Sequence, residues 1–186
     1  MKIVIAPNAL KDCLSASAAA AALARGVARA CPQAEIVQVP VADGGDGLAE
    51  VLLTALHGEA HSVVVTGPRG APVTASFCHV PAQRLAVIEM ATASGLALLS
   101  PAERDPTRTT TRGSGELIAA ALDLGIEHLV IGIGGSATHD GGIGLASALG
   151  ARFPDRNGVP VEPVGAMLAR IARIELSGLD PRLART

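Results

Sequence analysis

The stretch that most constrains the fold is an apolar run that ends in a glycine-rich loop, at positions 128–142. The run HLVI is followed by a segment with five glycines, two hydroxyls and one carboxylate. Glycines let backbone N–H groups approach an anion closely, and a following helix N-terminus adds a favourable dipole. The stretch therefore predicts a strand that delivers a phosphate-binding loop to a helix.

Two other interpretations of this loop stay open. The spacing Gly132-x-Gly134-x-x-Ala137 also satisfies a loose dinucleotide-binding pattern. The same glycines are typical of a plain tight turn between a strand and a helix.

Composition excludes several classes of protein. The 186 residues are 49% hydrophobic, so the chain can bury a hydrophobic core without help from disulfides or structural metal ions. Its formal charge is −2 and its aromatic residues are Phe77 and Phe153, which argues against nucleic-acid binding. Three scattered cysteines without a CxxC pair indicate neither a disulfide framework nor a zinc site, and favour the cytoplasm. The apolar runs are too short for a membrane span.

The order of apolar runs and turn residues predicts an α/β fold. Positions 3–6 form a continuous apolar run, typical of a strand buried on both faces. A helix capped by Ser15 or Ser17 and a strand over 36–39 complete a right-handed βαβ unit. Helices are expected over 48–56, within 90–99 and over 142–149. A further helix is opened by the segment 109–116 and ended by Gly125, and a further strand is expected over 173–176.

A β-rich segment interrupts this pattern. Short runs at 62–66, 72–77 and 85–89 have no helix between them and predict an antiparallel insertion. We expect positions 61–109 to form part of a smaller second domain, with 1–60 and 110–186 in the main domain.

Polar, glycine-rich segments fall where parallel strands end or helices begin, the edge at which ligands bind in open α/β sheets. These segments are 7–15, 42–47, 109–116 and 132–142, and they carry Lys11, Asp43, Asp46 and Asp140. A cation, N–H groups and carboxylates that can hold Mg²⁺ together suit phosphoryl transfer. The Walker A pattern is absent from the sequence, which disfavours a P-loop NTPase.

Each of these residues also has a structural interpretation. Lys11 can be a solvated loop lysine, and Asp43 with Asp46 can organise an Asx turn or cap a helix. Asp140 can cap the helix that follows it. His57 and His61 have i, i+4 spacing, but Gly58 lies between them, so we do not expect a metal pair there.

Five motifs carry a resemblance to a known family. The segments are APNALKDCLSA (6–16), VADGGDG (41–47), EMATASGL (89–96), GSGELI (113–118) and GIGGSATHDGG (132–142). In this order they resemble the APDSFKxSLSA, VADGGEGT, EMAxASGL, GTGELI and GIGGSATNDGG motifs of bacterial glycerate kinases of the GarK and GlxK type. The match extends over essentially the whole chain.

The resemblance implies a Rossmann-like domain facing a smaller domain, and an enzyme that phosphorylates D-glycerate with ATP and Mg²⁺, the 2-phosphate being favoured. It implies that Lys11, Asp43 and Asp46 serve catalysis, and that Asp43, Asp46 and Asp140 serve the metal. The resemblance is compatible with a homodimer. It implies ATP and glycerate as binding partners, and neither nucleic acid nor a membrane. The implied substrate- and phosphate-binding residues are Ser94, Thr110, Gly113, Ser114, Gly134, Gly135, Ser136 and Thr138.

Departures from the family pattern limit these expectations. Asn8-Ala9 stands where the family has Asp-Ser, Asp46 replaces Glu, Ser114 replaces Thr and His139 replaces Asn. Family members are about twice as long, so we expect the chain to correspond to their N-terminal part. The alternatives are a catalytically inactive fragment that binds phosphate or nucleotide or complements another chain, and a dinucleotide-binding protein.

Overall fold

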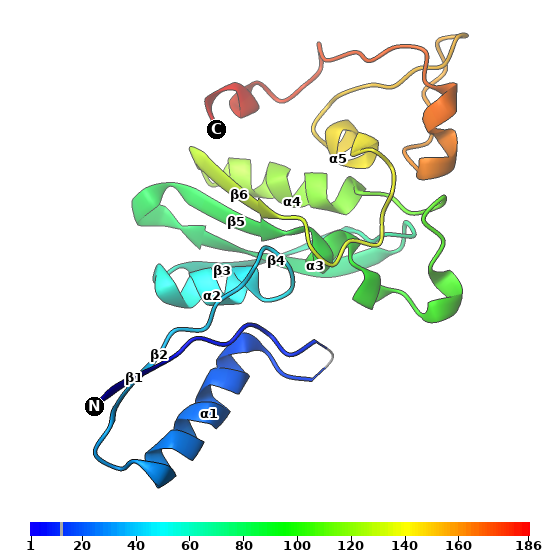
Figure 1. Ribbon diagram of the computed structural model, residues 1–186. Coiled ribbons are helices and arrows are strands. Elements are labelled where there is room, and N and C mark those ends of the chain that lie inside the picture. Colours follow the sequence, from blue (N-terminus) through cyan, green and yellow to red (C-terminus); the bar gives the residue numbers. More distant parts are fainter. Residues whose placement is uncertain (12) are drawn as a thin grey trace.

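The chain forms a mixed α/β structure with two separate sheets (Figure 1). A computed structural model describes residues 1–11 and 13–186. The first sheet belongs to an N-terminal βαβ unit, and the second carries the remaining strands with helices on both faces. The α/β class expected from the sequence is confirmed.

The N-terminal unit follows the predicted order. Strand β1 (Lys2–Ile5) leads to helix α1 (Ala16–Ala30) and then to strand β2 (Glu35–Gln38), which pairs with β1 in parallel. Ser15 is the N-cap of α1, and its hydroxyl accepts the Ala18 N–H at 3.3 Å. A small core around Ile5 holds α1 against the two strands.

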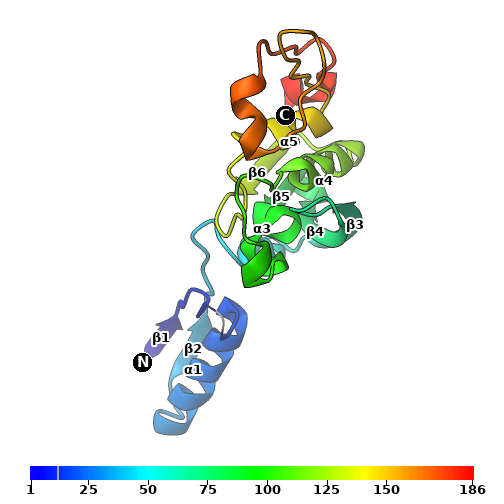
Figure 2. The same cartoon turned by 90° about the vertical axis from the view of Figure 1, so that its right-hand side faces the viewer.

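One face of this small sheet is open, and the expectation of a strand buried on both faces is wrong for β1. Val4 is 58% exposed, whereas Ile5 is 7% exposed. Successive side chains of a strand point to opposite faces, and α1 covers one face alone. Figure 2 shows the unit standing apart from the rest of the fold.

The second sheet has the strand order β3-β4-β5-β6. Strands β3 (Glu59–Thr66), β4 (Pro72–Val80) and β5 (Leu85–Glu89) are antiparallel neighbours, which confirms the predicted antiparallel segment. Strand β6 (His128–Gly132) then pairs with β5 in parallel.

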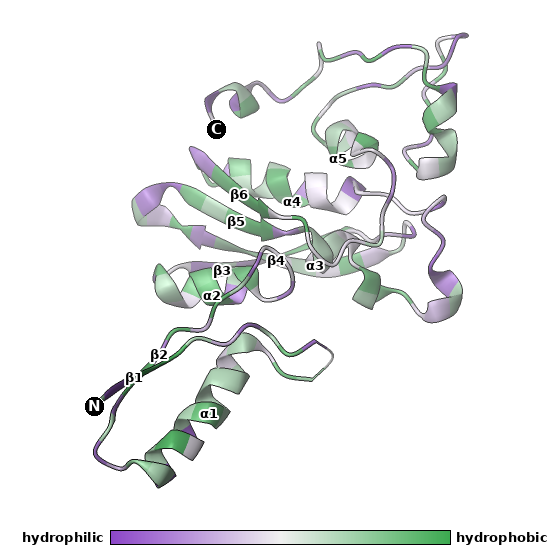
Figure 3. Cartoon of the chain, in the orientation of Figure 1, coloured by the Kyte–Doolittle hydropathy of each residue, from purple (hydrophilic) through white to green (hydrophobic). Residues whose placement is uncertain are grey.

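Helices cover both faces of this sheet. Helix α2 (Leu48–Ala55) packs on Cys78, Val80 and Val87, and helix α4 (Arg112–Asp123) packs on the opposite face in the largest core. Helix α3 (Met90–Ser94) follows β5, and helix α5 (Ile143–Ala148) lies beside α4. Figure 3 shows hydrophobic residues concentrated along β5 and β6, between the helices.

The sheets divide the chain differently from the domain boundaries expected from the sequence. Pairing runs from Leu85↔His128 to Glu89↔Gly132, so the segment 61–109 shares its sheet with β6. The cause is a pairing between residues about 43 positions apart, which no local pattern reveals. The N-terminal βαβ unit is the part with a sheet of its own.

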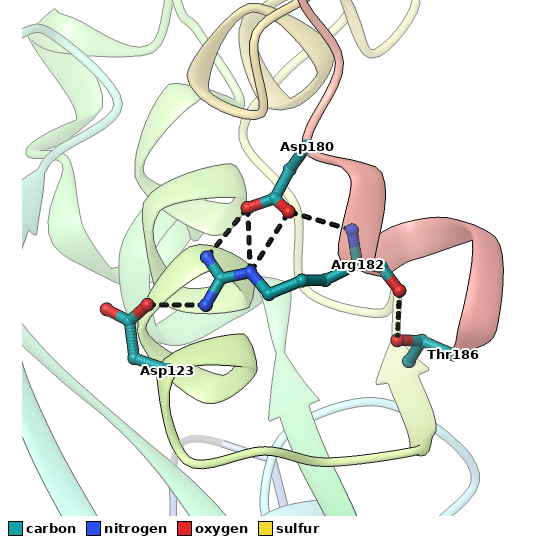
Figure 4. A network of polar contacts seen from close by, with 4 residues as sticks. All are labelled: Asp123, Asp180, Arg182 and Thr186. Atoms are coloured by element: carbon teal, nitrogen blue, oxygen red, sulfur yellow. Dashed lines mark hydrogen bonds and ion pairs between the residues drawn. The ribbon is translucent and has the colours of Figure 1, made fainter.

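The C-terminal segment wraps back onto α4. The strand expected over 173–176 is not formed in the described structure, where Glu175 makes an isolated bridge with Arg152. A 3-10 helix over Pro181–Arg185 is anchored by Arg182, whose guanidinium contacts Asp180 and, at 2.7 Å, Asp123 of α4 (Figure 4). Among the described residues, no helix has the length and apolar character needed to cross a bilayer.

Candidate functional site

Three loops, those after β1, β2 and β6, meet around a cavity of about 690 Å³. The first loop contributes Lys11, the second Asp43 and Asp46, and the third Gly134 and Gly135. The expected convergence of strand ends is thus observed for three of the four segments. The complete lining is Asn8, Ala9, Lys11, Asp43, Gly44, Gly45, Asp46, Leu48, Val130, Ile131, Gly132, Ile133, Gly134 and Gly135.

Glycines allow two of these loops to touch backbone to backbone. The Gly134 N–H donates to the Gly44 carbonyl at 2.9 Å. A Cβ on Gly134 would lie 2.5 Å from the Gly45 Cα, and a Cβ on Gly132 would lie 2.8 Å from the Gly44 carbonyl oxygen. These contacts leave no room for a side chain, so the glycines are required by packing as well as by any ligand.

Lys11 and Asp46 lie at the centre of the site. Both also line two adjoining cavities of about 320 and 340 Å³. The Asp46 carboxylate lies over the third loop, since a Cβ on Gly135 would be 2.8 Å from its Oδ1. A cation and a carboxylate therefore face the same space.

Asp43 sits beside them in the loop that follows β2. Its Oδ1 accepts the Gly45 N–H at 3.4 Å, a long contact that organises the turn. Asp43 and Asp46 are exposed at the cavity. They form a pair of oxygen donors of the kind that Mg²⁺ prefers.

The structure buries Ser94 and Ser114 away from the cavity lining. Both are 0% exposed, and their hydroxyls hydrogen bond to each other at 2.9 Å. Gly113 is needed for packing because a Cβ there would clash with the Thr66 carbonyl oxygen at the end of β3. Thr110 is buried and its Oγ1 accepts the Arg112 N–H at 3.2 Å. These four residues join α3, β3 and α4 rather than line the space around Lys11.

Asp140 is also occupied by internal hydrogen bonds. It is 1% exposed; its Oδ2 accepts from the Thr111 N–H and hydroxyl at 2.8 and 2.9 Å and from the Gly144 N–H at 3.2 Å. Its Oδ1 accepts the Gly142 N–H at 3.0 Å. The geometry favours the capping interpretation, since the carboxylate joins the starts of α4 and α5, and Asp140 is absent from the cavity lining.

Comparison with known proteins decides the family. A family model described as "Glycerate kinase family" matches residues 3–186. The chain belongs to the glycerate kinase family. The resemblance carried by the five motifs is thereby confirmed.

Relatives in this family cover nearly the whole chain. A glycerate kinase of Bacillus subtilis is 52% identical over 183 residues, and a glycerate 2-kinase of Escherichia coli is 49% identical over 183. A crystal structure of a candidate glycerate kinase 2 from Salmonella typhimurium LT2 superposes with a TM-score of 0.86 at 49% identity. The matches to these proteins cover 98–100% of this chain, but this chain spans only about half of the length of each of them.

The sequence analysis missed the role of Glu89, which lies beside this candidate site. The residue ends β5 and is 7% exposed, and its carboxylate accepts the Gly47 N–H at 3.2 Å and the Ala49 N–H at 2.5 Å. Burial raises the pKa of this carboxyl, and the nearby Asp46 and Glu50 charges raise it further, against the lowering effect of the two N–H donors. The motif EMATASGL contained Glu89, but only the fold brings it to the start of α2.

The hydroxyls of Ser136 and Thr138 complete the third loop. They hydrogen bond to each other at 2.8 Å, and the Ser136 hydroxyl also accepts the Thr138 N–H at 3.1 Å. Both residues are half-buried and lie beyond Gly135, outside the lining of the main cavity. The loop is thus held in shape by its own side chains.

Proposed function

We propose that this glycerate kinase family protein transfers the γ-phosphoryl group of ATP to a hydroxyl of D-glycerate, giving 2-phosphoglycerate. The observation that carries the proposal is the convergence of Lys11, Asp43, Asp46 and the 132–135 loop on one cavity. Phosphoryl transfer depends mainly on positioning and on stabilising charge, and this cavity offers groups for both.

The exposed carboxylates of Asp43 and Asp46 fit Mg²⁺, which takes hard oxygen ligands and keeps part of its water shell. When bound, the ion neutralises phosphate charge. We propose these two residues as its ligands and leave Asp140 out, because hydrogen bonds within the fold occupy both of its oxygens.

Lys11 would neutralise the oxygens of the transferred phosphoryl group, since an ammonium is a compact point charge with three donors. Gly134 and Gly135 would let a phosphate approach the loop closely. For Ser94, Thr110, Gly113 and Ser114 we propose support of the site through packing, because they are buried behind it.

The test is a coupled assay of ADP formation from ATP that requires D-glycerate. Lys11→Met is expected to lower kcat by about 10²- to 10³-fold, the effect of removing one preorganised charge-stabilising donor. Lys2→Met is the matched control, because Lys2 is an exposed lysine on β1 that pairs with Glu35. Equal activities of the two variants would contradict the role of Lys11, and ³¹P NMR of the product would distinguish the 2- from the 3-phosphate.

A second candidate function is a non-catalytic module that binds phosphate or nucleotide, or that complements another chain. The open face of the two-stranded sheet favours it, since Val4 is 58% exposed on a parallel strand and parallel sheets are normally covered on both faces. Turnover by the 186-residue chain alone would eliminate this candidate.

The proposal includes a cytoplasmic location. Cys13, Cys31 and Cys78 are free among the described residues, as is usual for proteins of a reducing compartment. A homodimer is a further option, which sedimentation of the purified chain would decide.

A further inference from the structure

A second group of ligand-type side chains lies at the other end of the four-stranded sheet. Glu59 and His61 begin β3, and His79 is near the end of β4. Glu59 pairs directly with His79, and His79 pairs with Ala86, three residues before Glu89 at the cavity edge of β5. The cluster is therefore separate from the proposed kinase site.

Strand register places the three side chains on one face of the sheet. Glu59 and His61 are two residues apart on β3, so both point to the same side, and the cross-strand partner of Glu59 does so too. One ligand atom of each residue lies within 4.8 Å of the others. The rings of His61 and His79 meet edge to face with centroids 5.4 Å apart.

One of these atoms lacks a partner. The Nε2 atom of His61 is buried and makes no hydrogen bond within the described residues. The nearest carboxylate oxygen, Oε2 of Glu59, is 3.7 Å away, which is too long for a hydrogen bond. A buried nitrogen without a partner costs free energy, and coordination of a cation would satisfy it.

We propose that Glu59, His61 and His79 bind a divalent transition metal of the Zn²⁺ type, with water in the fourth position. Two imidazoles and one carboxylate are a typical zinc ligand set, with bonds of about 2.0–2.2 Å. Mg²⁺ would not compete well, because it prefers an all-oxygen shell. The metal would tie the edge strand β3 to β4.

The chain spacing did not predict this group. The i, i+4 pair of His57 and His61 is broken by Gly58, and the actual partner of His61 is His79, eighteen positions further along the chain. Antiparallel pairing of β3 with β4 brings them together.

Isothermal titration of the untagged protein with Zn²⁺ alone tests the proposal. We expect one Zn²⁺ per chain and a raised thermal midpoint. His61→Asn should weaken binding by more than about 100-fold, because loss of an outer-shell partner alone costs 10–100-fold. Glu59→Gln should weaken it at least about tenfold, and it keeps the fold because Glu59 is exposed.

Two control variants distinguish Zn²⁺ binding at this cluster from Zn²⁺ binding elsewhere on the protein. His128→Asn removes an exposed histidine of β6 outside the cluster, and Asp46→Asn removes a carboxylate of the kinase cavity. Both should bind Zn²⁺ like the unmodified protein, and Co²⁺ should give the intense visible absorption of a tetrahedral site. Absence of stoichiometric binding, unchanged binding by Glu59→Gln and His61→Asn, or loss in Asp46→Asn would overturn the proposal.

Discussion

At the scale of single residues, Glu89 is a buried carboxyl that holds the backbone next to the cavity in place. Its carboxylate accepts two backbone N–H groups at the start of α2, next to Asp46. This capping fixes where the 43–47 loop ends and the helix begins. Glu89 is therefore a positioning residue for the cavity.

Replacing Glu89 with Gln is expected to lower the free energy of unfolding by about 1–3 kcal/mol, since the amide nitrogen cannot accept an N–H. Urea unfolding measures this cost. Glu50→Gln, an exposed change in the first turn of α2, is the matched control and should have little effect. A stability loss no larger than that of Glu50→Gln would contradict the capping role.

The same variant should change the pH dependence of stability. The pKa of Glu89 is raised in the folded protein, so the folded state holds the proton more tightly than the unfolded state. Its contribution to stability is full below the unfolded pKa and is lost as pH rises through the folded pKa. Unfolding measured as the pH rises from about 4.3, the ordinary glutamate pKa, should show this loss in the unmodified protein and not in Glu89→Gln.

At the scale of elements, most helices and strands could be predicted because their signals are local. The Ser15 cap, the apolar run of β6 and the short β-rich runs all mark their elements correctly. The pairing of β5 with β6 and the contact between the Ser94 and Ser114 hydroxyls join residues far apart in the chain, so no local sequence pattern could reveal them. The meeting of the loops after β1, β2 and β6 at one cavity could be predicted because each loop follows a strand, whereas the buried contacts behind the cavity could not.

Gly113 tests the packing interpretation of the GSGELI motif. Gly113→Ala places a methyl group against the Thr66 carbonyl oxygen and is expected to destabilise the fold by about 1–3 kcal/mol or more. Gly26→Ala is the matched control, because it lies in α1 with nothing within 4 Å of its Cβ and should stabilise by about 0.5–1 kcal/mol. Thermal unfolding compares the two; a neutral Gly113→Ala would favour a ligand role over packing.

At the scale of the whole molecule, the two sheets differ in how well they are supported. Strand β5 is central in its sheet, covered by α2 and α4, and its Ala86, Val87 and Ile88 are 0% exposed. The β1–β2 sheet has two strands, one covering helix and one open face. Two-stranded sheets are marginally stable by themselves, so the protein should consist of parts with unequal stability.

Hydrogen exchange is expected to reveal this inequality. Amides of β1 and β2 should exchange at least about tenfold faster than those of β5, because opening the small unit exposes little apolar surface. Val37, the strand partner of the exposed Val4, offers a variant: Val37→Ala lowers the β-propensity of the small sheet, so it should speed exchange in β1 and β2 and leave β5 unchanged. Equal protection of the two sheets, or an effect of Val37→Ala on β5, would show instead that the molecule opens as one cooperative unit. In that case the cavity loops would share the stability of the larger sheet. The open face of β1 would then not lower the local stability of the small sheet.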